Sequence, residues 1–373
     1  MAASSARARA AVSSSGPSFS TVTAPMPGGS GAAGLGAPPG CAVHDARGAL
    51  CLPGLVNSHN HSPLMAVRGM VEDRGFAPAY IPGVPQGHWL SEEETLALAR
   101  LGVMEMLCAG ATTIVDYYRC PGALAQAAEE FGLRAMVGGR VMDMDSAALA
   151  EGRFVEDRRL GEATLGAALE TVARWDGRGR ISAILAPHAP DSCSRRIFAE
   201  MRDLAAATGR QIHTHLSQSP MEVAQLRARE GMTPTEFLDD LGLLGPGLIA
   251  AHCIFMSGSD IARFGRSGAV VAHAPIGNAS FGAAAPVKAL QEAGAAVTLC
   301  TDTKSADMFE AMRMALAAAR SGQGCPSAAR PALRGRARRA RRRRSGGAGW
   351  QGGAGGRLLR HGPWGSPLFW LAP

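Results

Sequence analysis

Two pairs of histidines carry the clearest chemical signal in the sequence. His59 and His61 follow an apolar run in "LPGLVNSHNHSP", and His213 and His215 repeat the same spacing in "QIHTHL". Residues two apart in a strand face the same side, so each pair projects two imidazoles together. A lone histidine of this kind is more often a core residue whose nitrogens are satisfied by its neighbours.

These histidines are not alone, because polar residues close several other apolar runs. His188 and His252 end two such runs, His273 lies near the end of a third, and Asp302 ends the last one. Imidazoles and a carboxylate gathered without partners in an apolar cavity are costly to bury. A bound divalent cation removes that cost by using their lone pairs. The set therefore predicts a metal site.

The elements that must position these residues form a regular series. Eight short apolar runs predict strands at 50–59, 112–118, 134–141, 181–188, 211–216, 247–252, 269–275 and 296–302. Helical patterns lie between them, at 91–109, 194–208 and 306–320. This rhythm predicts an α/β protein with a (β/α)₈ TIM-type barrel, whose chemistry lies at the carboxyl ends of the strands. A doubly wound open sheet is the alternative that strand counting leaves open.

The two ends of the chain differ from its middle in composition. Residues 1–40 are rich in Ala, Ser, Gly and Pro without an acidic residue, and we expect them to be disordered. Residues 41–320 carry the barrel pattern. Residues 321–373 are rich in Arg and Gly and show no period, so we expect a disordered or non-native tail. Of the net charge of +7, residues 311–373 carry +13, which leaves −6 for residues 1–310. The positive net charge of the chain thus comes from its C-terminal tail, and the rest of the chain is mildly acidic.

Composition also limits the compartment and the partners. The eight cysteines are scattered without a C-x-x-C pair, no signal-peptide core precedes them, and no apolar run is long enough for a membrane span. We expect a cytoplasmic protein, with an organelle transit peptide as a weakly supported alternative. A G-x-G-x-x-G match at Gly29, Gly31 and Gly34 has no strand before it and no helix after it, so a dinucleotide site is rejected.

Five successive motifs give the sequence a specific resemblance. "LPGLVNSHNHSP", "HTHLSQS", "LIAAHCIFMS", "VAHAPIGN" and "LCTDTKSADMFEAMRMAL" resemble the signatures of the amidohydrolase superfamily, in the branch of cytosine deaminase, S-adenosylhomocysteine deaminase and the triazine hydrolases. The resemblance covers roughly residues 42–320. It implies one divalent ion, Zn²⁺ or Fe²⁺, held by His59, His61, His215 and Asp302.

The resemblance also implies roles for residues around the metal. His252 contacts the metal or its water and orients the nucleophile, Asp302 takes the proton, and His188 in "APHAPDSCS" contacts the substrate. A bound zinc ion lowers the pKa of water from 15.7 to about 7, which supplies hydroxide at neutral pH. Dinuclear relatives use a lysine at the end of the fourth strand. The lysines of this chain, Lys288 and Lys304, lie elsewhere, so we expect a single metal.

One position departs from the family pattern. The usual motif after the fifth strand is H-x-x-E, whose glutamate shuttles a proton, but this chain has "HLSQ" with Gln218 in the fourth place. Glutamine donates and accepts hydrogen bonds but does not titrate. Either Asp302 and His252 share all proton transfers, or the leaving group needs less acid assistance, or the substrate class differs. A defective site is the remaining alternative.

We therefore expect a metal-dependent hydrolase of non-peptide C–N bonds, an aminohydrolase of a heterocycle such as a purine, pyrimidine or triazine. The alternatives are a C–halogen or cyclic amide hydrolase on the same scaffold, and an inactive truncated or frame-shifted member, since the family's small β-sandwich subdomain is largely missing. A non-enzymatic alternative is a basic tail that binds nucleic acid, which the lack of interleaved aromatic residues disfavours. The expected partner is a small heterocyclic molecule, and homo-oligomerisation is left open.

Overall fold

The computed structural model describes residues 9–12, 42–45, 53–70, 90–303 and 305–321. The chain divides into two units, Met1–Pro53 and Gly54–Pro373. In the first unit, β1 (Arg9–Val12) pairs antiparallel with β2 (Ala42–Asp45). These are the strands among its described residues, so the prediction that the β-sandwich is largely missing is not contradicted. The expectations for the rest of 1–40 and for 322–373 lie outside the described residues.

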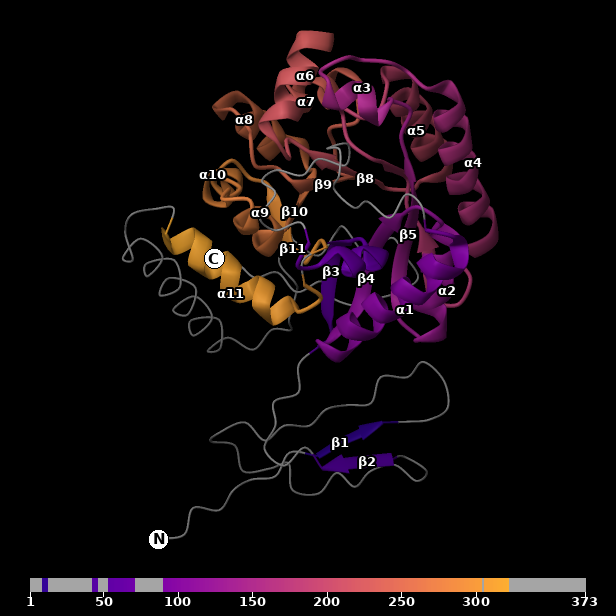
Figure 1. Ribbon diagram of the computed structural model, residues 1–373. Coiled ribbons are helices and arrows are strands. Elements are labelled where there is room, and N and C mark those ends of the chain that lie inside the picture. The colour runs from indigo at the N-terminus through magenta and orange to yellow at the C-terminus, as the bar shows by residue number, and fades with distance from the viewer. Residues whose placement is uncertain (1–8, 13–41, 46–52, 71–89, 304, 322–373) are drawn as a thin grey trace. The chain divides into compact units, whose positions relative to one another are not determined.

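The second unit alternates parallel strands with helices (Figure 1). One sheet contains β3 (Leu55–Asn60), β4 (Ala111–Tyr118), β5 (Arg134–Val141) and β6 (Ile181–Ala183), with β7 (Ala186–Pro187) also paired to β5. The other contains β8 (Ile212–Leu216), β9 (Leu248–His252), β10 (Val270–His273) and β11 (Ala296–Leu299). All eight predicted strands are present, and the fourth is divided into β6 and β7.

The two sheets meet at both pairs of edges through isolated parallel bridges, Leu185 with Ile212 and Asn60 with Asp302. The α/β class is confirmed, but the strand pairing does not run as one closed ladder. At the second junction β3 shifts register between Asn57 and Asn60, and Asp302 has a positive φ of 58°. Neither backbone continues a regular strand there. The pairing of the first and last strands is therefore limited to the single bridge between Asn60 and Asp302 among the described residues, next to the polar site residues.

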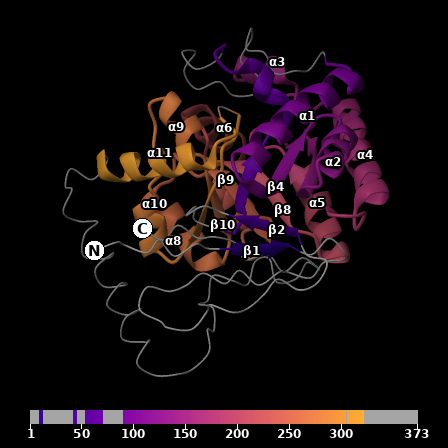
Figure 2. The same ribbon diagram turned by 90° about the horizontal axis from the view of Figure 1, so that it is seen from below.

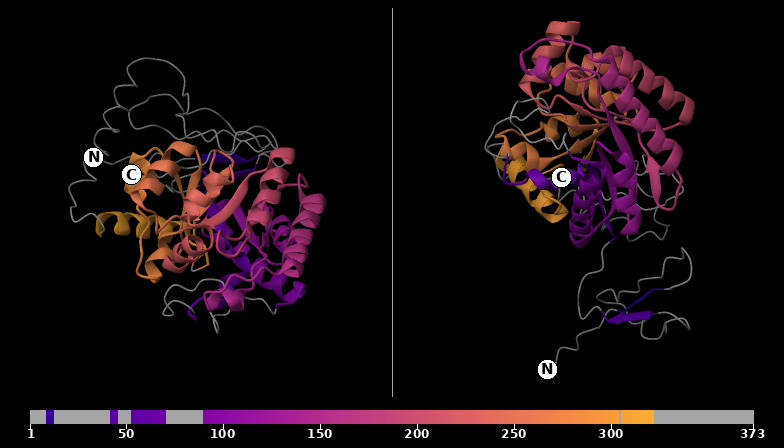
Figure 3. Two further views of the ribbon diagram at one scale, coloured as in Figure 1. Left: turned by 90° about the horizontal axis from the view of Figure 1, so that it is seen from above. Right: turned by 45° about the vertical axis from the view of Figure 1, so that its right-hand side comes forward.

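Helices lie around the outside of these strands (Figure 2; Figure 3). They are α1 (Glu92–Cys108), α2 (Pro121–Glu130), α3 (Ser146–Ala150), α4 (Arg158–Trp175), α5 (Arg195–Thr208), α6 (Pro220–Glu230), α7 (Pro234–Asp240), α8 (Gly258–Ser267), α9 (Pro275–Ser280), α10 (Val287–Glu292) and α11 (Met308–Ser321), with a 3₁₀ helix at Ser62–Val67. None of the described helices has the length and apolar character needed to cross a lipid bilayer.

Local signals explain where the helices begin and end. Ser91 accepts a hydrogen bond from the Glu94 backbone, and Glu94 accepts one from the Ser91 backbone, which confirms the capping box before α1. Gly209 ends α5 with a left-handed φ of 67°. Phe198 of α5 and Phe237 of α7 pack edge to face in the core, with ring centroids 5.7 Å apart.

Candidate metal centre

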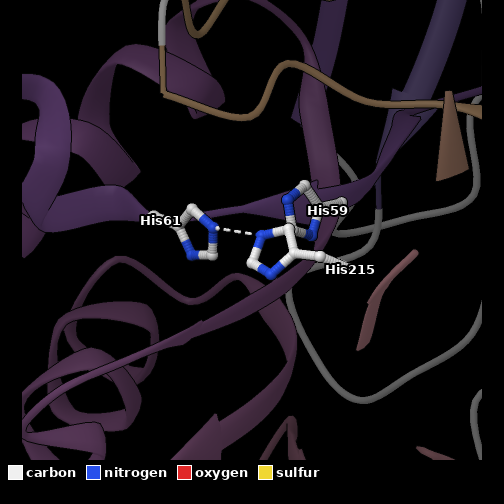
Figure 4. A group of neighbouring side chains, drawn as sticks. All are labelled: His59, His61 and His215. Atoms are coloured by element: carbon white, nitrogen blue, oxygen red, sulfur yellow. Dashed lines mark hydrogen bonds between the residues drawn. The ribbon is translucent and has the colours of Figure 1, made fainter. Parts of the chain in front are cut away.

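The carboxyl ends of β3, β8, β9 and the segment after β11 bring five predicted site residues together. His59, His61 and His215 place one ligand atom each within 4.8 Å of one another, and so do His59, His252 and Asp302. All five side chains are buried. His61 Nε2 lies 3.3 Å from His215 Nε2, with His59 beside them (Figure 4). The predicted meeting of separate strand ends is therefore present in the fold.

The carboxylate of Asp302 faces the histidines of β3. Its Oδ1 lies 3.6 Å from His59 Nε2 and 3.8 Å from His61 Nε2. These distances are longer than hydrogen bonds, so the three groups surround a common point without bonding directly to one another. One anionic oxygen and several neutral imidazole nitrogens form a donor set that suits zinc or iron.

Outer contacts orient three of these imidazoles. His61 Nδ1–H donates to the carbonyl oxygen of Tyr117 (2.6 Å), and His215 Nδ1–H donates to that of His188 (2.7 Å). His252 Nδ1 lies 3.0 Å from the side-chain oxygen of Asn278. Because each of these oxygens accepts a hydrogen bond from Nδ1–H, the proton of each ring lies on Nδ1 and Nε2 keeps a lone pair. Such outer partners fix the tautomer of metal-binding histidines.

Burial favours the neutral form of three of these imidazoles, those of His59, His61 and His215. It lowers the pKa of His59 and His215 well below the usual value, with neighbouring imidazoles adding to the effect. Burial also lowers the pKa of His61, against the opposing attraction of Asp302. Neutral imidazoles at neutral pH present lone pairs in place of N–H groups, which is the state that binds a cation.

Two nitrogens of the cluster have no hydrogen-bond partner among the described residues. They are His59 Nε2 and His252 Nε2, both fully enclosed. An unsatisfied buried polar atom costs about 1–3 kcal/mol. Since both residues belong to the group that converges with Asp302, a divalent cation bound there would give these nitrogens a partner. The residues present therefore fit the metal that their chemistry implies.

The backbone is strained at several residues that belong to this centre or lie next to it. Ser217, His252, Cys253 and Asp302 all have φ between 50° and 74°, in the left-handed region that favours glycine. Each such residue costs about 1–3 kcal/mol, and such strain is concentrated at functional sites. Three of the four lie at the end of a strand that supplies a site residue: Ser217 follows β8, His252 ends β9 and Cys253 follows β9. The strain therefore occurs where the chain turns away from these strands beside the centre.

His188 lies at the rim of the cluster. Its ring centroid is 4.8 Å from that of His215, and its Nδ1 lies 2.6 Å from the Ser192 hydroxyl. The loop that follows is held by Asp143, whose buried carboxylate accepts from the backbone and hydroxyl of Ser194. His188 thus lies beside the centre, and its contact with the substrate stays a prediction.

Gln218 lies just beyond β8, and its side chain is half-buried. No hydrogen bond between this side chain and the cluster is present among the described residues. Its backbone N–H donates to Glu222 (2.7 Å), as does that of Ser217 (2.8 Å). Burial, with the nearby Asp191 charge, raises the pKa of Glu222 to about 8. The fold holds the loop of Gln218 in place without joining its amide to the other site residues.

Sequence reasoning missed two residues that contact the cluster. Tyr117 is buried at the end of β4, with its hydroxyl 2.8 Å from His215 Nδ1 and its carbonyl on His61. Asn278, in α9, meets His252. Tyr117 stands near a strand end in "TTIVDYY", which is the signal that marks the other site residues. Asn278 is the last residue of the "VAHAPIGN" motif, but it lies beyond the predicted strand, so no strand end marks it.

The fold and the centre together define a parallel α/β protein that gathers a buried histidine and carboxylate metal site at the ends of its strands. The model of the amidohydrolase family matches residues 50–332. The chain belongs to the amidohydrolase family.

Individual relatives agree with this assignment. The chain is 32% identical to a 5'-deoxyadenosine deaminase of Methanosarcina mazei, over 73% of its own length and 62% of the relative's. It is also 32% identical to a 5-methylthioadenosine/S-adenosylhomocysteine deaminase of Halothermothrix orenii, over 71% of its own length and 59% of the relative's. The chain therefore spans about three fifths of the length of these proteins.

Solved structures give the same picture of the fold. A zinc-bound adenosine deaminase of Xanthomonas campestris matches with a TM-score of 0.62 and 28% identity, covering 73% of this chain and 62% of that one. A triazine hydrolase of Arthobacter aurescens matches with a TM-score of 0.66 and 23% identity, covering 74% of this chain and 66% of that one. At this lower identity the second likeness concerns the fold alone.

Proposed function

We propose that the chain is a metal-dependent aminohydrolase, which replaces an amino group on a nitrogenous heterocycle by oxygen and releases ammonia. One divalent ion, Zn²⁺ or Fe²⁺, is held by His59, His61, His215 and Asp302. The observation that carries the proposal is the convergence of these buried groups, with the orphaned Nε2 of His59 among them. The catalytic part of the chain comprises residues 41–320.

The names of the relatives favour a purine substrate. The curated relatives described above are named as deaminases of 5'-deoxyadenosine and of 5-methylthioadenosine and S-adenosylhomocysteine. A structure with bound guanine, a guanine deaminase of C. acetobutylicum, is 20% identical to this chain and supports the fold alone. We therefore propose an adenine-containing nucleoside as the first substrate to test, with other purines, pyrimidines and triazines as alternatives.

The chemistry follows from the groups at the centre. A divalent ion held by His59, His61, His215 and Asp302 would lower the pKa of water and so supply a hydroxide nucleophile at neutral pH. In this proposal Asp302 accepts the proton that the attacking water loses and returns it to the nitrogen that leaves. His252, whose Nδ1 faces the Asn278 oxygen, keeps its Nε2 lone pair to orient that water. His188, beside His215, is placed to contact the heterocycle.

Gln218 stands where the H-x-x-E motif of the family has a glutamate, which can carry a proton. Its amide can hydrogen-bond to the substrate but cannot carry a proton. Proton transfer then falls to Asp302 and His252. A leaving group that departs as an anion needs no such proton. This favours hydrolysis of a C–halogen bond as a second candidate function.

The test is a comparison of products from purified protein, first depleted of metal and then reloaded with zinc or iron. The substrates are 5'-deoxyadenosine, S-adenosylhomocysteine, guanine, cytosine, one amino-substituted triazine and one chloro-substituted triazine. The proposal expects metal-dependent ammonia release from at least one amino compound, in wild type and in His273→Gln but not in His61→Ala. Chloride release alone favours the second candidate. Metal-independent turnover, or turnover by His61→Ala, contradicts both.

Two further features belong to the proposal. We propose a cytoplasmic location, supported by scattered free cysteines such as the buried Cys193, Cys253 and Cys300. Self-association into a homo-oligomer is proposed as a secondary property. Fractionation of the expressing cells and size-exclusion chromatography with light scattering test these two points separately from the activity.

A further inference from the structure

One histidine of the metal centre has an outer partner of a different kind from the others. His61, His215 and His252 each direct Nδ1 at an oxygen that accepts a hydrogen bond. His59 directs Nδ1 at the Nε2 of His213, 2.7 Å away. The fully buried His213 is the first histidine of the second H-x-H pair, and the metal site does not use it as a ligand.

The contact between the two rings is a hydrogen bond in their common plane. The planes differ by 3°, and the ring centroids are 4.9 Å apart while the two nitrogens are only 2.7 Å apart. Rings stacked face to face would not bring two edge nitrogens this close at that centroid separation. One nitrogen must therefore carry a proton and the other a lone pair.

Two arrangements of protons satisfy this bond. In the first, His59 donates from Nδ1 and keeps a lone pair on Nε2, while the proton of His213 lies on its Nδ1. In the second, His213 donates from Nε2, so that His59 carries its proton on Nε2, 3.6 Å from Asp302 Oδ1. Only the first arrangement gives the centre a lone pair from His59. The second blocks a cation with an N–H group.

We propose that His213 is a positioning residue that sets the tautomer of His59: its Nε2 accepts the hydrogen bond from His59 Nδ1–H, which leaves the lone pair of His59 Nε2 facing the centre. The inference rests on the proposed metal site. An oxygen acceptor in place of His213 would hold His59 permanently in the metal-binding form. An imidazole whose proton lies on Nδ1 acts in the same way, because the lone pair on its Nε2 accepts the hydrogen bond from His59.

The outer end of the pair supports this role over a packing role. His213 Nδ1 is buried without a hydrogen-bond partner among the described residues. A histidine kept only for its volume would leave this nitrogen unsatisfied at a cost that an apolar residue avoids. The cost is compensated by the bond to His59.

The test measures zinc affinity by competition with a chromophoric chelator, without substrate. His213→Leu removes the hydrogen bond but keeps an apolar filling, and the loss of an outer partner weakens metal binding ~10–100-fold. His213→Gln supplies an amide oxygen and is expected to recover a large part of that loss. The matched control is His273→Leu, another buried histidine with an unpartnered Nδ1 at a strand end, whose zinc affinity is expected to stay within about threefold of wild type. Thermal unfolding of each metal-free variant checks folding.

The outcomes separate the inference from the proposed function. Wild-type protein that binds no zinc overturns the metal site and the inference together. Zinc binding by wild type with equal affinity in His213→Leu overturns the inference alone, and so does a loss in His273→Leu as large as that in His213→Leu. Where His213→Leu does not fold, His213→Asn replaces it. Its shorter amide does not reach His59, and the same ~10–100-fold weakening is expected.

Discussion

The backbone N–H of Asp302 donates to the carbonyl oxygen of His59 at 3.1 Å, while the carboxylate of Asp302 faces the Nε2 of the same histidine. The last strand segment and the first are thus joined by the backbone of the residues whose side chains meet at the centre. Because Asp302 turns with a φ of 58°, the chain places its carboxylate inward in place of continuing β11.

Asp302→Asn tests the carboxylate with little change of shape. Asparagine tolerates the left-handed backbone that position 302 requires, so the variant is expected to fold with nearly the stability of wild type. It removes the proposed anionic ligand, which is also the proposed proton acceptor. We expect zinc affinity to fall by about 100-fold or more and turnover to fall by ~10²–10⁴-fold. Retained turnover at the wild-type level, measured with saturating zinc, contradicts the assigned role.

Gln218→Glu tests whether the loop after β8 reaches the reacting atoms. The substitution restores a titrating group where wild type has an amide, and a carboxyl group near the leaving nitrogen contributes to proton transfer. We expect turnover to change by at least severalfold and its pH profile to gain an ionisation that wild type lacks. Gln211→Glu, which changes another partly buried glutamine at the opposite end of β8, is the matched control. Superimposable profiles for Gln218→Glu and wild type would place Gln218 outside the site.

Acid is expected to destabilise the metal-free protein through its buried histidines. Burial, with the nearby His252 imidazole, lowers the pKa of His273 from 6.5 to about 4. Between pH 6.5 and 4 this histidine therefore binds a proton in the unfolded chain but stays neutral in the folded chain. Its contribution to the free energy of unfolding is complete above pH 6.5 and is lost as the pH falls toward 4. His273→Gln should reduce the slope of the unfolding free energy by about 1.4 kcal/mol per pH unit in this range. Urea titrations at pH 7, 6 and 5 measure it, and parallel slopes would contradict the assignment.

The core under α5 and α7 gives a stability test independent of the metal. Phe237 is fully buried against Phe198. Phe237→Ala is expected to lower the free energy of unfolding by about 3–5 kcal/mol, because a large cavity replaces the ring. Leu316→Ala on α11, where the side chain is 49% exposed, should change it by less than about 1 kcal/mol. Equal effects in denaturant titrations of the two variants would contradict the packing described.

The strands and helix ends were predictable because their signals are local. Apolar runs marked each strand from 55–60 to 296–299, and Ser91 with Glu94 marked the start of α1. The ligand set came from the same strand ends together with the family resemblance. Residue spacing also indicated that His213 shares a strand with His215.

The contacts that tune the centre were not predictable in this way. Whether His213 meets His59, or Asn278 meets His252, depends on the stagger of strands far apart in the sequence and on the turn of each ring. The division of the fourth strand into β6 and β7 and the narrowed pairing near Asn60 also depend on how neighbouring strands fit. No residue pattern within one segment carries that information.

The most direct test of the account is the metal content of the purified protein, measured by elemental analysis for zinc and iron against protein concentration. We predict about one metal ion per chain in wild type and in His273→Gln, and less than about a tenth of that in His59→Ala and Asp302→Asn. Equal trace levels in wild type and in the two ligand variants would contradict a metal centre built from these residues.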